Sequence, residues 1–519
     1  MHNILIAILF IIGFAARLLF LADFPKGIMQ DEAFSVWQAW ALLEHGLDVG
    51  GYENAVIIPY YGVGAAPFYY HFCEIFIAIF GVDIFAVRLA NAILGCLTLI
   101  IAYFFAKKMI DKKFAMLVLF LLAINPWHIM ASRLAFEITP AVFFMLLGSY
   151  LFSLGLEKPK LLILSAISYG LTFYCYMPFW VVVPPVVLLQ MIYYRKISPA
   201  FIITITLFGI PCVWFLLVNF GFLPEFRSSL ISIPKLPSLR TGDFSLNIAE
   251  NIYWLFFILF YGRHFTLNRS VDVIPDFGLF YQFSLVFILI GFILIIRNMF
   301  FTKKQQELAF AAFPILGAIP YCLFHSGNAF KAMIQQYIFL YIPLIFCCAY
   351  GIYEIIKNFN LQNRRILKIS ILTTYSIAFI CFLNTYTYTT KHIAYNNGWQ
   401  QALERSIKET KIVNLLNITE GYFLLGTMFP PKEFAEYSKS IRGTGTDFLL
   451  TKEIGKYRFH YRGEFELEED EVYIFLYSYN NGSVNSITHD LVNEFLKHGF
   501  SVDLIDGYAY VYKDKEIPP

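Results

Sequence analysis

Long apolar stretches recur along the chain up to about residue 389 and are separated by short polar turns. A membrane-spanning helix needs about 20 mostly apolar residues to cross roughly 30 Å of hydrocarbon. By that measure the pattern predicts about eleven spans. They are expected at residues 3–22, 85–106, 114–130, 138–156, 161–177, 179–194, 199–219, 278–296, 308–324, 333–356 and 367–389. The first stretch lacks a small-residue cleavage site and leads into further spans, so we expect it to be a retained helix.

Basic residues gather in alternate connections between these spans, at 107–113, 158–160, 195–196, 297–304 and 357–368. The positive-inside rule predicts that these connections are cytoplasmic. The N-terminus is then cytoplasmic, and the C-terminus lies outside. The apolar segment 252–261 is short for a span, so we expect an interfacial or re-entrant helix within an outer loop at 220–277.

The character of the chain changes near residue 390. Short β-like runs appear at 472–476 and 508–512, and residues 487–497 have helical spacing of apolar positions. The sequence therefore predicts a transmembrane domain at 1–389 and a small extracytoplasmic α/β domain at 390–519.

Composition agrees with lipid as the main solvent. Hydrophobic residues make up 58% of the chain and charged residues only 15%, against about a quarter charged in soluble proteins. The formal net charge of +2 gives no strong electrostatic field that would attract nucleic acid. From the apolar composition, the expected partner is the lipid bilayer. The eight cysteines lie in or beside apolar stretches and form no CxxC pair, which excludes a disulfide framework of the secreted type.

The first outer loop, 23–84, is long for a connection between helices, and long loops are usually functional. Asp31 and Glu32 precede Phe34 and Trp37, which recur at helical spacing. This pattern predicts an amphipathic helix at the membrane interface. The two acids could simply complement the helix dipole, worth about 0.3–1 kcal/mol, and that alternative stays open.

Ionisable residues also lie near the outer ends of several spans, and each is surrounded by apolar sequence. They are Arg17, Glu74, Arg88, Arg133, Glu137, His325 and Lys331. Such a group costs about 2.5–3.5 kcal/mol to insert and usually faces a cavity or a partner. Each one alone could snorkel or pair structurally. Their convergence on one leaflet favours a polar chamber that could hold a lipid phosphate, deprotonate an acceptor hydroxyl and stabilise a departing phosphate.

The segments that carry a resemblance are 31–70, 81–89 and 125–137. Together they resemble the membrane glycosyltransferases of the GT-C superfamily, most closely the bacterial branch of the protein O-mannosyltransferase-like family, glycosyltransferase family 39. The resemblance is good over about residues 1–180 and weak in the later spans. It implies a GT-C type helical bundle with interfacial helices in the first outer loop.

The resemblance also implies roles for individual residues. Asp31 is expected to be the catalytic base, with Glu32 helping to place the acceptor. Arg133 is expected to hold the donor phosphate, with Lys331, His325 and Arg88 as further candidates for phosphate binding. Glu137 departs from the family spacing, so it could orient Arg133, bind acceptor or assist a metal.

Tyr69 and His71 in the first loop are candidates for binding sugar or acceptor, the alternative being an aromatic interfacial belt. The implied reaction moves a sugar from a polyprenyl phosphate to an acceptor protein, lipid or glycan, with inversion, in glycosylation of the cell envelope. Relatives differ in their need for a divalent metal, and no motif here decides that point. The rival hypotheses are a transporter or flippase of a lipid-linked saccharide, which should show inverted repeats, and a catalytically silent membrane partner.

Overall fold

The structure is a computed structural model. It describes residues 2–237, 246–261, 277, 279–302, 305–324, 334–392, 398–442, 449–461, 467–477 and 486–513. The chain forms two compact units. The helical unit comprises residues 1–21, 89–217 and 241–387, and the mixed unit comprises 22–88, 218–240 and 388–519. The predicted division at residues 389 and 390 remains a prediction.

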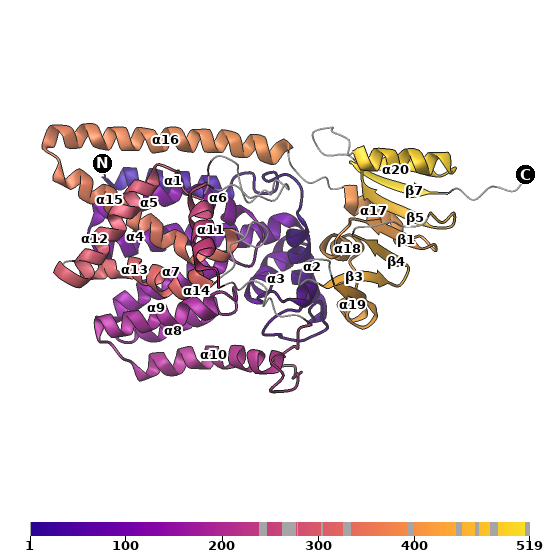
Figure 1. Ribbon diagram of the computed structural model, residues 1–519, viewed down its shortest axis with the longest axis horizontal. Helices are drawn as coiled ribbons and strands as arrows, with labels where there is room; N and C mark the ends of the chain where they lie inside the picture. The colour runs from indigo at the N-terminus through magenta and orange to yellow at the C-terminus, as the bar shows by residue number, and fades with distance from the viewer. Residues whose placement is uncertain are drawn as a thin grey trace, which may run out of the picture. The chain divides into compact units, whose positions relative to one another are not determined.

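Helices make up nearly all of the helical unit (Figure 1). They are α1 (His2–Leu18), α4 (Ile84–Met109), α5 (Lys112–Ala123), α6 (Pro126–Arg133), α7 (Thr139–Gly155), α8 (Leu161–Thr172), α9 (Phe179–Tyr194), α10 (Pro199–Asn219), α11 (Ile248–Tyr261), α12 (Ser284–Arg297), α13 (Ala309–Gly317), α14 (Ile319–Phe324), α15 (Tyr341–Asn358) and α16 (Leu361–His392). The short helical turns are η3 (Asn298–Thr302), η4 (Gln306–Leu308) and η5 (Ile334–Leu340).

Every predicted span falls on one or two of these helices. Within the described residues, 6 helices are long and apolar enough to cross a membrane, or 7 if one bent pair counts as a span. Shorter apolar helices of 10–17 residues include α1, α7, α8 and α9. The chain is therefore a mainly helical, multi-pass membrane protein, whereas the number of eleven spans remains a prediction. The segment 252–261 lies in α11, whose Asn251 donates to the Leu323 carbonyl at 2.7 Å.

The predicted span 114–130 is not one straight helix. It divides into α5 and α6, which meet at a bend of 59°. The reason is local, because the Asn125 side chain accepts a hydrogen bond from the His128 amide and Pro126 occupies the first position of α6. An asparagine N-cap followed by proline starts a new helix.

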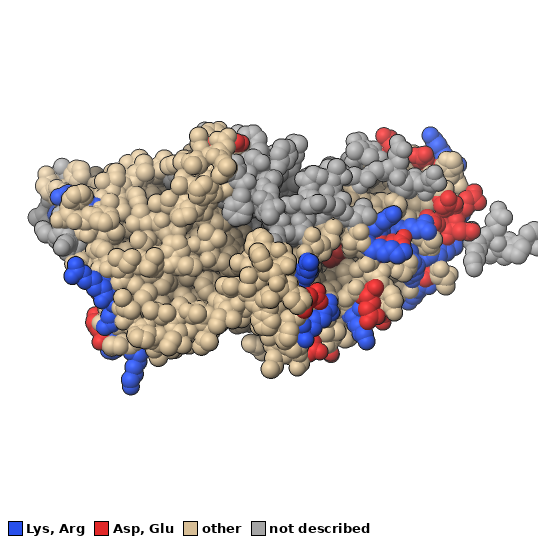
Figure 2. Space-filling view, turned by 60° about the horizontal axis from the view of Figure 1, so that its bottom comes forward, with Lys and Arg blue, Asp and Glu red and all other residues tan. Residues whose placement is uncertain are grey.

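Close packing in the helical unit depends on small residues. A Cβ at Gly291 of α12 would lie 1.8 Å from the Cys347 carbonyl of α15, and one at Gly351 would lie 2.1 Å from the Phe287 carbonyl. Small residues let helix backbones approach in membranes. At one end of the bundle Lys108 pairs with Glu157 and Glu307 at 2.6 and 3.0 Å. Figure 2 shows few other charges on the helical unit in that view, as expected for a surface in lipid.

The mixed unit begins with the first loop, which contains α2 (Gln30–His45), η1 (Tyr60–Gly62) and α3 (Phe68–Phe80). The helix expected after Asp31 is present as α2, and its central residues, Glu32 to Ala39, are buried within the structure. A single bridge pairs Ala55 with Ser232, which ties residues 218–240 to this loop.

The C-terminal part of the mixed unit is a seven-stranded sheet in the order β2-β3-β4-β1-β5-β7-β6. The strands are β1 (Val413–Leu416), β2 (Lys439–Arg442), β3 (Leu449–Ile454), β4 (Tyr457–His460), β5 (Val472–Leu476), β6 (Ser501–Ile505) and β7 (Tyr508–Tyr512). The helices are α17 (Gly398–Ser406), α18 (Glu420–Thr427), α19 (Pro431–Tyr437) and α20 (Ser486–Lys497). Strand β1 is parallel to β4 and β5, and the other pairs are antiparallel.

Side chains of α20 build the core on one face of this sheet. Phe495 and Val492 pack against Tyr473, Phe475 and Val511 of the strands. Figure 2 shows lysine, arginine and acidic side chains gathered over the surface of this domain. The expectation of a small α/β domain with strands at 472–476 and 508–512 is confirmed.

Candidate functional site

The N-terminus of α2 is built around a buried carboxylate. Glu32 is 0% exposed, and its Oε2 accepts a long hydrogen bond of 3.4 Å from the Met29 amide, the residue that caps the helix. Glu32 is the third residue of α2, so this bond satisfies one amide that the helix itself leaves unpaired. Gly46, with φ of 67°, ends the helix in the left-handed conformation.

Arg88 is the main partner of Glu32. Its Nε donates to Oε1 at 2.8 Å and its Nη2 donates to Oε2 at 2.7 Å, and both side chains are shielded from solvent. Two further hydrogen bonds of 2.8 Å run from the same guanidinium to the carbonyls of Pro25 and Gly27. These four hydrogen bonds use most of the five donors of an arginine. Here the Arg88 side chain therefore fixes the entry to α2, and phosphate binding by Arg88 remains a prediction.

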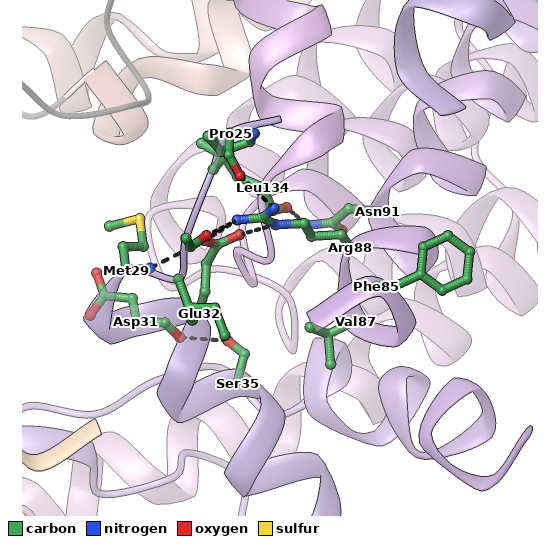
Figure 3. A network of polar contacts seen from close by, with 12 residues as sticks. Pro25, Met29, Asp31, Glu32, Ser35, Phe85, Val87, Arg88, Asn91 and Leu134 are labelled. Carbon is green, nitrogen blue, oxygen red and sulfur yellow. Dashed lines mark hydrogen bonds and ion pairs between the residues drawn. The ribbon is translucent and has the colours of Figure 1, made fainter. Parts of the chain in front are cut away.

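Asp31 stands on a different side of the same helix turn. In Figure 3 its carboxylate points away from the Glu32–Arg88 pair, and the residue is half-buried, in contrast to Glu32. The Asp31 carbonyl accepts a hydrogen bond of 2.8 Å from the Ser35 hydroxyl, one turn along α2. The ion pair thus holds the backbone that presents Asp31, while the Asp31 carboxylate is directed elsewhere.

The next predicted group is Arg133, the last residue of α6 in the helical unit. Arg133 is 4% exposed, and its guanidinium donates to the carbonyls of Ala16, Leu19 and Phe20 at 2.9–3.1 Å. Those carbonyls lie at the end of α1, where a helix leaves acceptors unpaired and favours a cation. Asn91 donates to the carbonyls of Leu134 and Phe136 and so holds the following turn.

Arg17 has a comparable structural use. It is fully buried and donates to the carbonyls of Leu122 and Ala123 at the end of α5, at 3.0 and 3.2 Å, and to His128 Nδ1. Because α5 ends at the bend, these carbonyls have no partner within the helix. They accept hydrogen bonds from Arg17, which explains why a cation lies in this apolar stretch of the sequence.

The next predicted residues have contacts of their own or lie in a turn. Tyr69 is fully buried and donates to the Val87 carbonyl at 2.6 Å, and His71 pairs with Glu74 at 2.6 Å. Glu137 lies half-buried in the turn before α7. His325 and Lys331 lie outside the described residues. The binding roles of all five remain predictions.

The C-terminal domain places an unpredicted acid near α2. Glu420, the first residue of α18, is 5% exposed, and its Oε2 accepts a hydrogen bond of 2.6 Å from Thr451 of β3. No motif marks this residue, and its partner Thr451 lies 31 positions away in the sequence. Burial raises the pKa of the Glu420 carboxyl to about 7, with the Thr451 hydrogen bond as the opposing influence.

Helices α2 and α18 pack tightly. A Cβ on Gly421 would lie 2.3 Å from the Gln30 carbonyl. The Tyr422 hydroxyl donates to the Ile28 carbonyl at 3.1 Å, and the Trp37 indole donates to the Phe429 carbonyl at 3.0 Å. These contacts bring Glu420 into the surroundings of Asp31, since both acids raise the pKa of Tyr60 and Tyr61, after burial as the largest cause.

In the part of the chain that the structure describes, no group of three or more His, Cys, Asp or Glu side chains lies closely enough together to hold a metal ion. Asp31 and Glu420 could each contribute one oxygen ligand.

Comparison with known proteins places this geometry in a wider group. Residues 64–218 match the family model described as dolichyl-phosphate-mannose-protein mannosyltransferase. No curated protein matches the sequence.

Solved structures share the fold at low identity. ArnT from Cupriavidus metallidurans bound to undecaprenyl phosphate superposes with a TM-score of 0.59 and 11% identity, over 98% of this chain and 97% of that one. The apo form of the same protein gives 0.54 and 11%, over 82% and 84%. The Archaeoglobus fulgidus oligosaccharyltransferase in complex with Zn and sulfate gives 0.51 and 15%, over 81% and 61%.

The match of 64–218 covers the α3–α10 region, which includes Arg88 and Arg133, and the fold likeness extends across the helical bundle and the C-terminal domain. The resemblance seen in the sequence is thereby confirmed. The chain is a multi-pass membrane protein whose residues 64–218 match the dolichyl-phosphate-mannose-protein mannosyltransferase family model, and it shares the fold of ArnT.

Proposed function

We propose that this protein transfers a sugar from a polyprenyl-phosphate donor to an acceptor hydroxyl at the outer face of the cytoplasmic membrane, with inversion at the anomeric carbon. The observation that carries the proposal is that the two acids at the start of α2 have different surroundings. Glu32 is committed to Arg88, with hydrogen bonds of 2.7 and 2.8 Å, whereas Asp31 points away from that pair and stays half-buried. Glu32 is therefore given a structural role, and the Asp31 carboxylate, which is directed away from the ion pair, is assigned to the chemistry.

In this proposal the Asp31 carboxylate removes the proton from the acceptor hydroxyl. The acceptor oxygen attacks the anomeric carbon, the new glycosidic bond forms, and the bond from that carbon to the phosphate oxygen breaks. The electron pair leaves with the polyprenyl phosphate, and the proton remains on Asp31. Arg133 is assigned to the departing phosphate, with Lys331 and His325 as additional cations, because fixed cations stabilise charge that develops on a leaving group.

Two further points support a lipid-phosphate donor, and a third supports a site at the outer face. The ArnT structure of the same fold is bound to undecaprenyl phosphate. The family model that matches residues 64–218 is named for a dolichyl-phosphate-mannose reaction. The basic connections predicted to be cytoplasmic put the first loop on the opposite side. The acceptor, whether protein, lipid or glycan, is left to experiment.

The test is a transfer assay with purified protein in nanodiscs. A panel of radiolabelled undecaprenyl-phosphate sugars is offered together with an envelope extract. Wild type is compared with Asp31→Asn and with a matched control, Asp23→Asn, which alters an exposed acid of the same loop. Label should move from lipid to acceptor with wild type and Asp23→Asn for at least one donor, and far more slowly with Asp31→Asn. Folded protein that only moves intact lipid-linked sugar across liposomes would establish the flippase alternative instead.

A further inference from the structure

Residues 219–236 form a hairpin in the mixed unit, at the end of α10. The Phe226 amide donates to the Ile233 carbonyl at 3.2 Å, and the Ile233 amide donates back to the Phe226 carbonyl at 2.7 Å. At the base of the hairpin the Asn219 side chain donates to the Pro234 carbonyl at 3.1 Å. Hydrogen bonds at the base and along the limbs therefore fix the shape of the hairpin.

The two limbs of the hairpin have opposite surroundings. The inner limb, 231–236, packs on the first loop, because Ile233 is fully buried and the Val56 amide donates to the Ser232 carbonyl at 3.0 Å. Every residue of the outer limb, 220–227, is exposed. Its apolar members are Phe220, Phe222, Leu223, Pro224 and Phe226. The hairpin is thus an ordered element with one limb held by the protein and one exposed apolar limb.

The charges of the outer limb balance. Between residues 220 and 233 the sequence has two charged residues, Glu225 and Arg227. They pair at 2.6 Å, and the Arg227 guanidinium also lies over the Tyr52 ring of the first loop, 3.9 Å from its centroid. Exposed apolar patches mark contacts with other proteins or with membranes. A limb with five apolar residues and no net charge fits an apolar partner.

The length of α10 identifies that partner. Its 21 residues make a helix of about 31 Å, which matches a hydrocarbon layer of roughly 30 Å. Phe222 follows the last residue of α10, Asn219, by three positions, so the two Cα atoms lie at most about 11 Å apart. Side chains of Phe and Leu at such a boundary lie about 5–10 Å deep between headgroups and acyl chains. Since α10 is apolar enough to cross a membrane, the outer limb starts where the hydrocarbon ends.

We infer that the outer limb lies in the membrane interface at the end of α10, with Phe222 and Leu223 in contact with the lipids of that leaflet. Phe222 is 74% exposed and Leu223 42% exposed within the protein, so both side chains have surface to offer to lipid. Because the inner limb is hydrogen-bonded to the first loop, the hairpin anchors the loop that contains α2 to the membrane surface. This inference is independent of the reaction that the protein catalyses.

Photo-cross-linking tests the contact. The photoreactive residue p-benzoylphenylalanine replaces Phe222 in the full chain, which is reconstituted in liposomes of phosphatidylethanolamine and phosphatidylglycerol and irradiated. Val213 of α10 is the positive control site at 57% exposure, and Leu504 of β6 is the negative control site at 58%. Intact mass spectrometry should show phospholipid adducts at position 222 with a yield within about threefold of that at 213, and about tenfold or more above that at 504.

The other products of the cross-linking identify the other occupants. A covalent dimer formed through position 222 would assign the outer limb to a second copy of the chain. A cross-link within one chain would show that the protein itself covers the limb. Lipid adducts no more frequent than at Leu504 would exclude contact with the membrane. Each of these three results overturns the inference.

A charged substitution tests whether the apolar surface holds the limb in the lipid. With the photoreactive residue at position 222, Leu223→Asp should lower the yield of lipid adducts by about fivefold or more, because a carboxylate is expelled from hydrocarbon. The control is Leu496→Asp on α20, which is 52% exposed and should leave that yield unchanged. Both side chains are exposed, so the apparent Tm in detergent should stay close to that of wild type. An unchanged yield in Leu223→Asp would show that the connection to α10 alone brings position 222 to the lipid, and the anchoring role would be refuted.

Discussion

Glu32 and Arg88 form a two-point ion pair, Nε to Oε1 at 2.8 Å and Nη2 to Oε2 at 2.7 Å, with both side chains out of contact with solvent. The pair joins the first turn of α2 to the first turns of α4 through two residues that are 56 positions apart in the sequence. The main role of this ion pair is structural, because it fixes the backbone from which Asp31 projects. A buried pair adds little net stability, but the loss of one partner leaves an uncompensated charge.

Arg88→Ala should therefore destabilise the protein by about 3–5 kcal/mol. The double variant Glu32→Met/Arg88→Met should recover a large part of that loss, because no buried charge remains. Thermal unfolding in one detergent gives the comparison. Lys357→Ala, which breaks an exposed pair with Glu354, is the control and should cost about 1 kcal/mol or less. A loss for Arg88→Ala as small as that of the control would show that the pair does not hold α2.

Gly421→Ala should disturb the packing of α18 on α2, because the added Cβ would lie 2.3 Å from the Gln30 carbonyl. We expect a cost of about 1–3 kcal/mol from overpacking, and reduced transfer. Gly209→Ala in α10 is the matched control, since its Cβ would meet its first neighbour at 4.0 Å. That change should be neutral, or stabilising by up to about 1 kcal/mol through helix propensity. Equal effects of the two variants on the apparent Tm would argue against tight docking.

The Glu420 carboxyl should make stability depend on pH. Burial raises its pKa from 4.5 to about 7, so between these values the folded protein holds a proton that the unfolded chain has lost. Stability should therefore fall as pH rises from about 4.5 to 7 and then level off, with a total loss of up to about 3 kcal/mol from this group. Glu420→Gln should reduce the slope. Apparent Tm values at pH 5 and 8 check this, and identical pH slopes in both proteins would contradict it.

Asp48 adds to the same trend. Burial raises its pKa from 3.8 to about 7, against opposing hydrogen bonds from the Tyr52 and Gly50 amides. Some slope should consequently persist in Glu420→Gln.

Arg133 has a structural use and a proposed catalytic one, and kinetics can separate them. If it also stabilises the leaving phosphate, Arg133→Ala should lower kcat/KM for the donor by about 100-fold or more in the fraction that remains folded. If it serves only the carbonyls of Ala16, Leu19 and Phe20, the variant should melt earlier but react normally once folded. The assay is donor kinetics normalised to monodisperse protein.

The sequence predicted the elements well where a local pattern controls them. Apolar length gave the membrane helices, alternation and helical spacing gave β5, β7 and α20, and Asp31-Glu32 before an aromatic period gave α2. The bend at residues 124–125 was missed, although Asn125-Pro126 is a recognised signal for a helix start. Average hydropathy over a window conceals such a break.

Features that depend on contacts between residues distant in the sequence could not be predicted from local patterns. The sequence predicts Arg17, Arg88 and Arg133 as cations that face a polar chamber. In the structure Arg17 and Arg133 donate to backbone carbonyls at the ends of α5 and α1, and Arg88 pairs with Glu32 and donates to the Pro25 carbonyl. These partners are distant in the sequence, so no local pattern identifies them. Glu420 carries no motif, and the docking of α18 on α2 joins residues as far apart as Trp37 and Phe429, which are separated by 392 positions. The strand order likewise follows from long-range pairing.

The central claim, that Asp31 is the base of a sugar transfer from a polyprenyl phosphate, is tested most directly by the initial rate of Asp31→Asn. The assay uses purified, monodisperse protein with a donor that wild type accepts, and donor binding is measured in parallel. We predict a rate lower by a factor of about 100 to 10,000, with donor affinity and apparent Tm close to those of wild type. Transfer at the wild-type rate by Asp31→Asn would contradict the account.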